Sequence, residues 1–340
     1  MKLKQFQKDL IKNNIDGAFF LSKDPAFFYF SQVKIKDSYL FIPSKGAPLL
    51  LVSSLEKPNT KIKILFFKNL LKDIKDLFKK KNIKVLGINE SVFTVKQNKL
   101  FSKFVKTKDV EAILSTLRLT KSSKEVSLIK NACTLTEKIL KEIISDFTFK
   151  LEGDVKNYIK KRAFELGCKL SFEPIVASGK NASVPHYEGN AKLKKGFLVI
   201  DMGLKYKGYC ADITRTFYLG KVSKKELEVY NGLLKIQEQA IKMVVSGRKI
   251  SEIELFVRKS LGKEEKYFSH SLGHGLGLEV HELPVISSKN KEVLKEGMVI
   301  TIEPGIYKNF GIRIEDDVLV TKKGPILLSN VSKNLIFPKV

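Results

Sequence analysis

The amino-terminal part of the chain alternates short apolar runs with amphipathic stretches. Three apolar runs, GAFFL (17–21), SYLFI (38–42) and PLLLV (48–52), have the length and composition of buried strands. The stretch NLLKDIKDLFKK (69–80) instead repeats its apolar positions every three or four residues, which is typical of an amphipathic helix. Residues 1–117 are therefore predicted to form an α/β domain.

The segment RLTKSSKE (118–125) joins this domain to a region with a different pattern. Ser122 or Ser123 can cap a helix there, because apolar residues recur at helical spacing from Val126 onward. The rest of the chain mixes helical patterns with hairpins, so residues 118–340 are predicted to form an α+β domain. The further elements are helices over 153–166 and 224–245 and β-hairpins over 197–219 and 298–320.

Composition adds limits on the class of protein. A length of 340 residues fits about two domains. No apolar run approaches the ~18–20 residues that cross a bilayer, and the charged start MKLKQFQKDLIKNN lacks the apolar core of a secretion signal. The widely spaced Cys133, Cys168 and Cys210 disfavour a disulfide framework or a thiolate zinc site, so a reducing cytoplasm is the expected location.

Positive charge dominates the composition, with 62 Lys and Arg against 36 Asp and Glu and a net charge of +26. Such an excess raises the question of a nucleic-acid or acidic partner. The lysines are scattered over nearly every segment, however, and few residues are Arg, which is the side chain suited to bidentate phosphate and guanine contacts. We therefore attribute the charge to a lysine-rich composition and disfavour specific binding of nucleic acid.

Candidate chemistry begins in the hairpin of residues 197–219. A tight turn centred on Tyr206 and Lys207 would place Asp201 directly opposite Asp212, with Cβ atoms ~4.5–5.5 Å apart. Two carboxylates at that separation repel each other unless a proton or a cation lies between them. The alternative is a pair of solvated aspartates on an exposed strand face, and this hairpin alone does not choose between the two.

The hairpin of residues 298–320 repeats the arrangement. A turn near Asn309 would place Glu303 opposite Glu315. Arg313 shares a strand face with Glu315, and Asp317 shares it too if the strand stays regular. Alone, Arg313 and Glu315 are typical of a surface ion pair, but two carboxylate pairs in two similar hairpins favour a cation site.

All four histidines follow residue 185, in the half of the chain that carries these carboxylates. His270, His274 and His281 lie in the glycine-punctuated stretch HSLGHGLGLEVH, and His186 lies in the loop sequence SGKNASVPHYEG. A single histidine is more often structural than catalytic. The run GHGLG resembles a dinucleotide-binding fingerprint only superficially, because no strand-turn-helix unit accompanies it.

These motifs resemble a known family, the pita-bread metallopeptidases, which include methionine aminopeptidase, aminopeptidase P, prolidase and creatinase. The resemblance rests on DMGLKYKGYCADITRTF, GHGLGLEVHE, TIEPGIY and GIRIEDDVLV and extends over about residues 118–338. It implies a pita-bread catalytic domain over 118–340. Residues 1–117, including FFLSKDPAFFYFSQ, resemble the α/β accessory domain of the creatinase and prolidase type, which methionine aminopeptidases generally lack. VPHY, HELP and GIRIED look like the proline-directed members, and creatinase is disfavoured because it does not keep this ligand set.

The resemblance also implies a centre of two divalent metal ions. Asp212 and Glu315 would bridge both ions, Asp201 would complete one side, and His274 with Glu303 would complete the other. This oxygen-rich donor set suits Mn²⁺, the first expectation, as well as Co²⁺, Zn²⁺ or Fe²⁺. Two such metal ions, typically ~3.5–4 Å apart, hold a bridging water as hydroxide and polarise the peptide carbonyl.

Further roles follow from the same resemblance. Glu303 would also serve as the proton shuttle, and His186 and His281 would contact the substrate and stabilise the tetrahedral intermediate. Arg313 would orient the acidic ligands and offset their charge. His270 is expected to line the proline pocket, with packing beneath the site as its alternative.

The preferred activity is that of an Xaa-Pro aminopeptidase, which releases the residue before proline from peptides. The alternative is an Xaa-Pro dipeptidase, or prolidase. A non-catalytic module that binds nucleic acid or the ribosome on the same fold is a remote alternative, because such relatives tend to lose metal ligands. A proline-containing peptide is the expected partner, no membrane is expected, and a homodimer is the expectation from the family alone.

Overall fold

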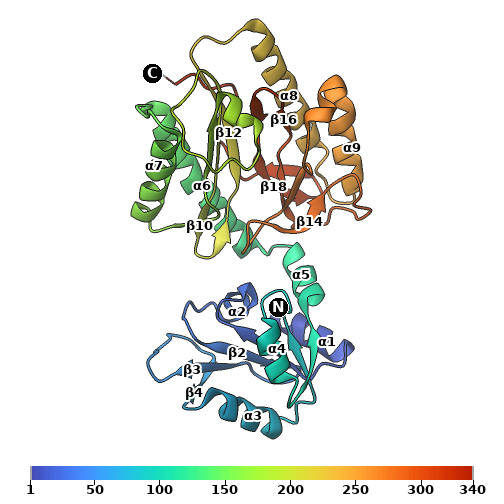
Figure 1. Cartoon of the computed structure of the whole chain (residues 1–340). Helices are drawn as coiled ribbons and strands as arrows, with labels where there is room; N and C mark the ends of the chain where they lie inside the picture. Colours follow the sequence, from blue (N-terminus) through green and yellow to red (C-terminus); the bar gives the residue numbers. More distant parts are fainter. Residues whose placement is uncertain (1, 339–340) are drawn as a thin grey trace. The chain divides into compact units, whose positions relative to one another are not determined.

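The protein is described by a computed structural model, in which residues 2–338 are placed. Its chain divides into two compact units, one ending at Arg118 and the other beginning at Leu119 (Figure 1). Among the residues described, no helix is both long and apolar enough to cross a membrane. Each unit has its own hydrophobic core and is described by itself.

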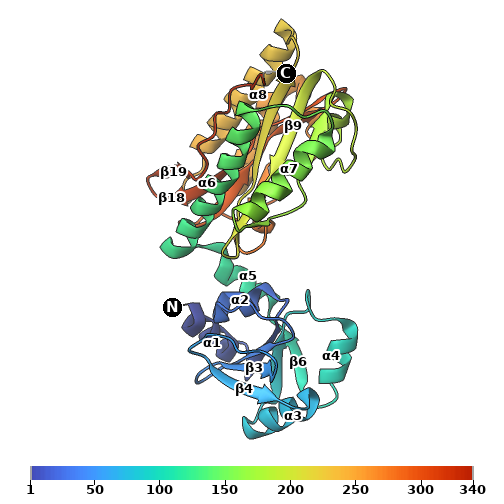
Figure 2. The same ribbon diagram turned by 90° about the vertical axis from the view of Figure 1, so that its left-hand side faces the viewer.

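The first unit contains a six-stranded sheet with helices on both faces (Figure 2). The predicted α/β architecture is confirmed, as are the predicted strands and the amphipathic helix. The sheet is mixed, because its strands pair in both parallel and antiparallel directions. The elements are α1 (Lys2–Lys12), β1 (Gly17–Leu21), α2 (Pro25–Ser31), β2 (Tyr39–Pro43), β3 (Leu49–Ser53), β4 (Lys63–Phe67), α3 (Leu70–Lys80), β5 (Val85–Ile88), α4 (Val95–Phe101), β6 (Lys106–Asp109) and α5 (Glu111–Leu119).

Strand β1 lies inside this sheet, whose order is β4-β3-β2-β1-β5-β6. All of its residues are buried. Ala18 and Phe20 pack into a core with α1, α2 and α5, whereas Phe19 and Leu21 pack into a core with α3 and α4. Side chains alternate between the two faces of a strand, so a strand covered on both faces is apolar at successive positions.

The second unit places helices outside several small sheets (Figure 1). Helices α6 and α7 pack against β7, β8, β10 and β11, and α8 and α9 pack against β14, β15 and β19. The elements are α6 (Ser123–Ser145), α7 (Glu152–Glu165), β7 (Lys169–Leu170), β8 (Ile175–Ser178), the 3₁₀ helix η1 (Gly179–Ser183), β9 (Gly196–Met202), β10 (Leu204–Tyr206), β11 (Tyr209–Cys210), β12 (Ile213–Leu219), α8 (Lys224–Lys242), α9 (Ile250–Leu261), the 3₁₀ helix η2 (Gly262–Tyr267), β13 (Gly273–Gly275), β14 (Glu282–Ile286), β15 (Val299–Ile302), β16 (Gly305–Tyr307), β17 (Gly311–Arg313), β18 (Asp316–Thr321) and β19 (Gly324–Leu327).

The first helix of this unit starts where its cap was predicted. Ser122 is the N-cap of α6, and its hydroxyl and the Glu125 carboxylate form a reciprocal capping box. Ile129, Ala132 and Cys133 are buried along one side of the helix. The helices predicted over 153–166 and 224–245 are likewise confirmed as α7 and α8.

The turn of the first hairpin differs from the prediction by one residue. Lys207 and Gly208 occupy the two turn positions, with φ of 47° and 97°. Two-residue turns of this type need positive φ at both central positions, which glycine adopts without steric cost. The turn therefore uses Gly208 and leaves Tyr206 in the strand.

Because of this shift, the two aspartates do not face each other directly. Asp201 pairs with Thr214, so the predicted pairing of Asp201 with Asp212 is wrong. Asp212 lies just before β12. It is next to an interruption of the hydrogen-bonding ladder, between the β9–β12 and β10–β11 pairs, where the backbones of Gly203 and Ala211 come close together. A Cβ on Gly203 would lie 1.8 Å from the Ala211 carbonyl oxygen. The hairpin passes from one sheet to another at this break, next to the two carboxylates.

The second hairpin has the predicted register. β15 pairs with β18 and β16 pairs with β17 in a single register centred on Asn309. Glu303 and Glu315 lie in the break between these two ladders, so the register places them opposite each other, as predicted. Both hairpins therefore interrupt their hydrogen-bonding ladders where they carry acidic side chains.

Candidate metal centre

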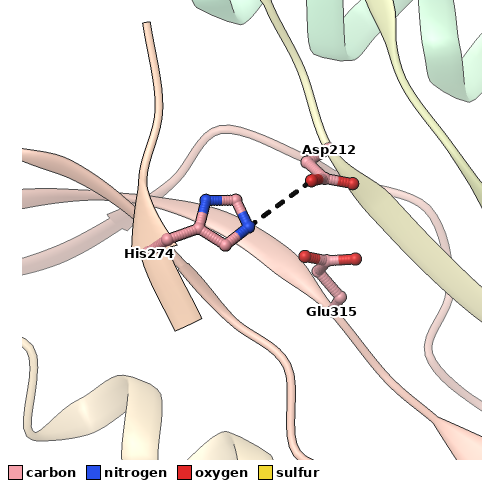
Figure 3. A group of neighbouring side chains, drawn as sticks. All are labelled: Asp212, His274 and Glu315. Atoms are coloured by element: carbon pink, nitrogen blue, oxygen red, sulfur yellow. Dashed lines mark ion pairs between the residues drawn. The ribbon is translucent and has the colours of Figure 1, made fainter. Parts of the chain in front are cut away.

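Three of the five expected ligands converge in the core of the second unit. One ligand atom from each of Asp212, His274 and Glu315 lies within 4.8 Å of the other two. Figure 3 shows these side chains pointing toward one another, Asp212 from the residue before β12, His274 from β13 and Glu315 from the residue before β18. His274 Nε2 lies 3.7 Å from Asp212 Oδ2 and 3.3 Å from Glu303 Oε1, which brings Glu303 into the same cluster.

Asp201, the remaining expected ligand, is held by an arginine. The Arg313 guanidinium donates a hydrogen bond through NH2 to Asp201 Oδ2 and, through Nε, another of 3.0 Å to Thr214 Oγ1. Thr214 Oγ1 in turn donates to Glu315 Oε2 at 2.6 Å. Arg313 therefore fixes one carboxylate directly and a second through a hydroxyl, while its charge offsets part of their repulsion.

Backbone and hydroxyl contacts orient the histidine. His274 Nδ1 lies 3.1 Å from the Gly275 carbonyl oxygen, a pairing that assigns the proton to Nδ1 and leaves the Nε2 lone pair toward the carboxylates. Thr301 Oγ1 accepts the backbone N–H of His274 at 3.0 Å and donates to Glu303 Oε1 at 3.1 Å. Thr301 thus couples the positions of two expected ligands.

The electrostatics of the cluster fit a bound cation. Burial, followed by the charge of neighbouring carboxylates, raises the pKa values of Asp212 and Glu315 well above their ordinary range. Burial raises the pKa of Glu303 to about 8 and lowers the pKa of His274 to about 4, so the imidazole is neutral. The Oδ1 atoms of Asp201 and Asp212 are buried without a hydrogen-bond partner among the residues described.

A neutral imidazole lone pair that faces carboxylate oxygens at 3.3–3.7 Å is repelled by them unless a proton or a cation lies between them. Divalent cations supply that charge and take nitrogen and oxygen donors together. The donor set and the unpartnered oxygens therefore fit divalent metal.

The other three histidines lie around this cluster at different depths. His281 is exposed, and its ring centroid lies 4.4 Å from that of His274. Burial, followed by the nearby His186, lowers the pKa of His281; His186 is itself exposed. His270 instead lies against Tyr307, with Nε2 2.9 Å from the phenol oxygen, and burial lowers its pKa to about 4.

Several residues of the site were not among the predicted ones. Tyr307 links His270 to Arg313, whose NH1 donates to the phenol oxygen at 3.0 Å. Asp317 Oδ2 accepts the backbone N–H of Asp212 at 3.0 Å and the Cys133 thiol at 3.2 Å. The sequence placed Asp317 only on the strand face of Arg313 and Glu315, and the position of Tyr307 at the end of the motif TIEPGIY is the signal that could have indicated it.

Comparison with known proteins agrees with the geometry. Residues 127–322 match the model of metallopeptidase family M24, which covers more than half of the chain. The chain belongs to metallopeptidase family M24. Residues 2–120 match the creatinase/prolidase N-terminal domain, so the accessory domain of the aminopeptidase P and prolidase branch is present too. The pita-bread fold expected from the sequence is confirmed.

Individual relatives match over the whole length. The chain is 34% identical to a Xaa-Pro dipeptidase of Pyrococcus horikoshii, over 98% of each sequence. Among solved structures, a Xaa-Pro dipeptidase from Bacillus anthracis aligns with a TM-score of 0.92 at 27% identity, over 99% of both chains. An X-Pro aminopeptidase from Thermotoga maritima aligns with a TM-score of 0.88 at 28% identity, over 95% of this chain and 98% of that one.

Proposed function

We propose that this protein is a metal-dependent Xaa-Pro dipeptidase. The observation that carries the proposal is the full-length similarity to a relative with that name, combined with a cluster of acidic side chains and a neutral histidine that fits divalent metal. The sequence alone favoured an Xaa-Pro aminopeptidase over a prolidase, and the comparisons favour the reverse order.

We assign the metal ligands to Asp201, Asp212, His274, Glu303 and Glu315. Metal ions bound there would lower the pKa of a water molecule and polarise the peptide carbonyl, so no nucleophilic side chain is required. Mn²⁺ is the first candidate, and Co²⁺, Zn²⁺ and Fe²⁺ suit the same donors. The accessory domain is assigned to residues 1–117 and the catalytic domain to residues 118–340.

The protein's own residues then divide the remaining work. Glu303, whose Oε1 lies 3.3 Å from His274 Nε2, takes the proton of the attacking water and delivers it to the nitrogen of the departing proline. His186 and His281, both exposed beside the cluster, bind the substrate and donate to the oxygen that becomes negative. Arg313 keeps Asp201 in place through its buried charge.

His270 is assigned to the wall of the pocket that receives the proline ring, steadied by its contact with Tyr307. An Xaa-Pro bond lacks an N–H group, so a pocket shaped for the ring can accept a bond that general peptidases handle poorly. Neutral His270, with a pKa of about 4, suits an apolar ring better than a charged imidazolium would.

An Xaa-Pro aminopeptidase is the second candidate, favoured by the structural match to the Thermotoga maritima enzyme. Parallel hydrolysis of Ala-Pro and Ala-Pro-Ala, with products identified by mass, separates the two. Alanine release from Ala-Pro at a higher kcat/KM than from Ala-Pro-Ala supports the dipeptidase. Efficient cleavage of the tripeptide alone would establish the aminopeptidase instead.

A further inference from the structure

Glu152, the first residue of α7, is a fully buried carboxylate that the proposed mechanism does not use. Its Oε1 accepts the Ser178 backbone N–H at 2.8 Å, the Ser178 hydroxyl at 2.9 Å and the Asn181 amide at 3.1 Å. Its Oε2 accepts the Ala191 backbone N–H at 2.9 Å and the Asn181 amide at 3.3 Å. One side chain therefore binds both ends of the segment between Ser178 and Ala191.

The rest of the first turn of α7 binds the same segment. The Gly153 N–H donates to Asn190 Oδ1 at 2.8 Å, and Lys156 Nζ donates to the Gly189 carbonyl oxygen at 3.0 Å. A Cβ on Gly153 would lie 2.5 Å from Asn190 Oδ1, so a larger residue there would have to displace the Asn190 side chain. The start of α7 therefore binds the carboxyl-terminal end of the loop, at Gly189 and Asn190.

The middle of this loop reaches the metal centre. It carries His186, and the preceding Pro185 carbonyl oxygen lies 3.5 Å from Arg313 NH1. β17, the strand of Arg313, passes so close that a Cβ on Gly311 would lie 1.6 Å from the Ala182 carbonyl oxygen. The loop therefore lies between the start of α7 and the strand that holds a ligand in place.

We propose that Glu152 is a positioning residue that sets the place of His186 at the active site. This inference rests on the proposed function for the part His186 plays, but the anchoring itself rests only on the contacts above. A carboxylate is needed because every partner of Glu152 is a donor, and an ionised carboxyl group only accepts. Glutamine would turn an NH₂ group toward donors and leave at least one of them unpaired in a buried place.

The test is Glu152→Gln, measured by hydrogen exchange and by kinetics on the full chain loaded with Mn²⁺. Backbone amides of residues 179–190 should exchange faster, while those of β9 and β15 stay protected. The kcat/KM for Ala-Pro should fall about 10- to 100-fold, since small misplacements of a binding group cost that much. The Mn²⁺ dissociation constant should stay within about threefold, because the ligands are not touched.

Glu142→Gln is the matched control. Glu142 also binds α7, accepting from Arg162 Nε at 2.7 Å, but it does not contact the loop. This variant should leave loop exchange and kcat/KM at wild-type values. If Glu152→Gln does not fold, Lys156→Met should show the same pattern with smaller changes, because it loses the bond to Gly189 and the contact of the ammonium group with the Tyr187 ring.

A double mutant distinguishes positioning from general damage. If Glu152 acts through His186, then Glu152→Gln added to His186→Ala should lower kcat/KM by less than about threefold further. The proposal would be overturned if the two substitutions lowered kcat/KM by factors that multiply in the double mutant. It would also be overturned if the amides of residues 179–190 exchanged at the wild-type rate in Glu152→Gln. If wild-type protein cleaves no Xaa-Pro peptide, the proposed function fails, and the exchange data still decide whether Glu152 anchors the loop.

Discussion

Replacing Arg313 with methionine tests how the protein tolerates a concentration of buried acidic groups. The Arg313 residue is 4% exposed, and its side chain pairs with Asp201 and donates to Thr214 and Tyr307 at 3.0 Å each. Methionine fills a similar volume but removes the charge and every donor. Asp201 then remains buried beside other carboxylates without a cation.

Removing one partner of a buried ion pair typically costs about 3–5 kcal/mol, because the other charge is left uncompensated. In a unit of roughly this size, each kcal/mol lowers the melting temperature by about 2–4 °C. Metal-free Arg313→Met should therefore melt roughly 6–20 °C below the metal-free wild type. Added Mn²⁺ should recover part of this loss, because it supplies positive charge at the same carboxylates.

Scanning calorimetry of chelator-treated protein provides the measurement, since it resolves the transitions of two units. Arg248→Met is the control, because Arg248 pairs with Glu252 at 3.1 Å and both side chains are exposed. Such pairs contribute little to stability, so this variant should melt close to the wild type. Equal melting temperatures for the two variants would refute the idea that Arg313 compensates a buried charge.

Three further predictions concern single side chains. Thr214→Val loses the 2.6 Å bond to Glu315 and should weaken Mn²⁺ binding about 10- to 100-fold in a chelator competition, whereas an unchanged affinity would remove Thr214 from ligand positioning. Asp212→Ala should abolish Mn²⁺ binding and His281→Ala should lower turnover while keeping metal; the opposite pattern would make the ligand assignment wrong. Cys210→Ala should retain activity, because this buried thiol donates to the Leu278 carbonyl oxygen and not to an assigned ligand, and loss of turnover would give it an unassigned role.

The two hairpins show how far sequence patterns reach. Around Asn309 the register could be predicted, and it brings Glu303 and Glu315 together. In the other hairpin, the turn lies one position later than predicted, because its two central residues, Lys207 and Gly208, must adopt positive φ. Hydrophobic periodicity carries no information about this requirement. Both aspartates nevertheless lie close together, because they flank the place where that hairpin changes sheets.

Residues that support the site were harder to predict. The Thr214 hydroxyl binds Glu315, which lies far away in the sequence, and the Thr301 hydroxyl joins the distant backbone N–H of His274 to the neighbouring Glu303. Glu152 is an acidic residue at the start of a helix, a place where such residues commonly lie exposed and favour the helix dipole. Only the folded chain shows it buried against both ends of a loop.

The most direct test of the central claim is a titration of chelator-stripped protein with Mn²⁺ while alanine release from Ala-Pro is followed. The account predicts no activity without metal and full activity once two ions are bound per chain, because five side chains are assigned as ligands of a two-ion centre. Cleavage that does not depend on metal, or no cleavage at any occupancy, would contradict it.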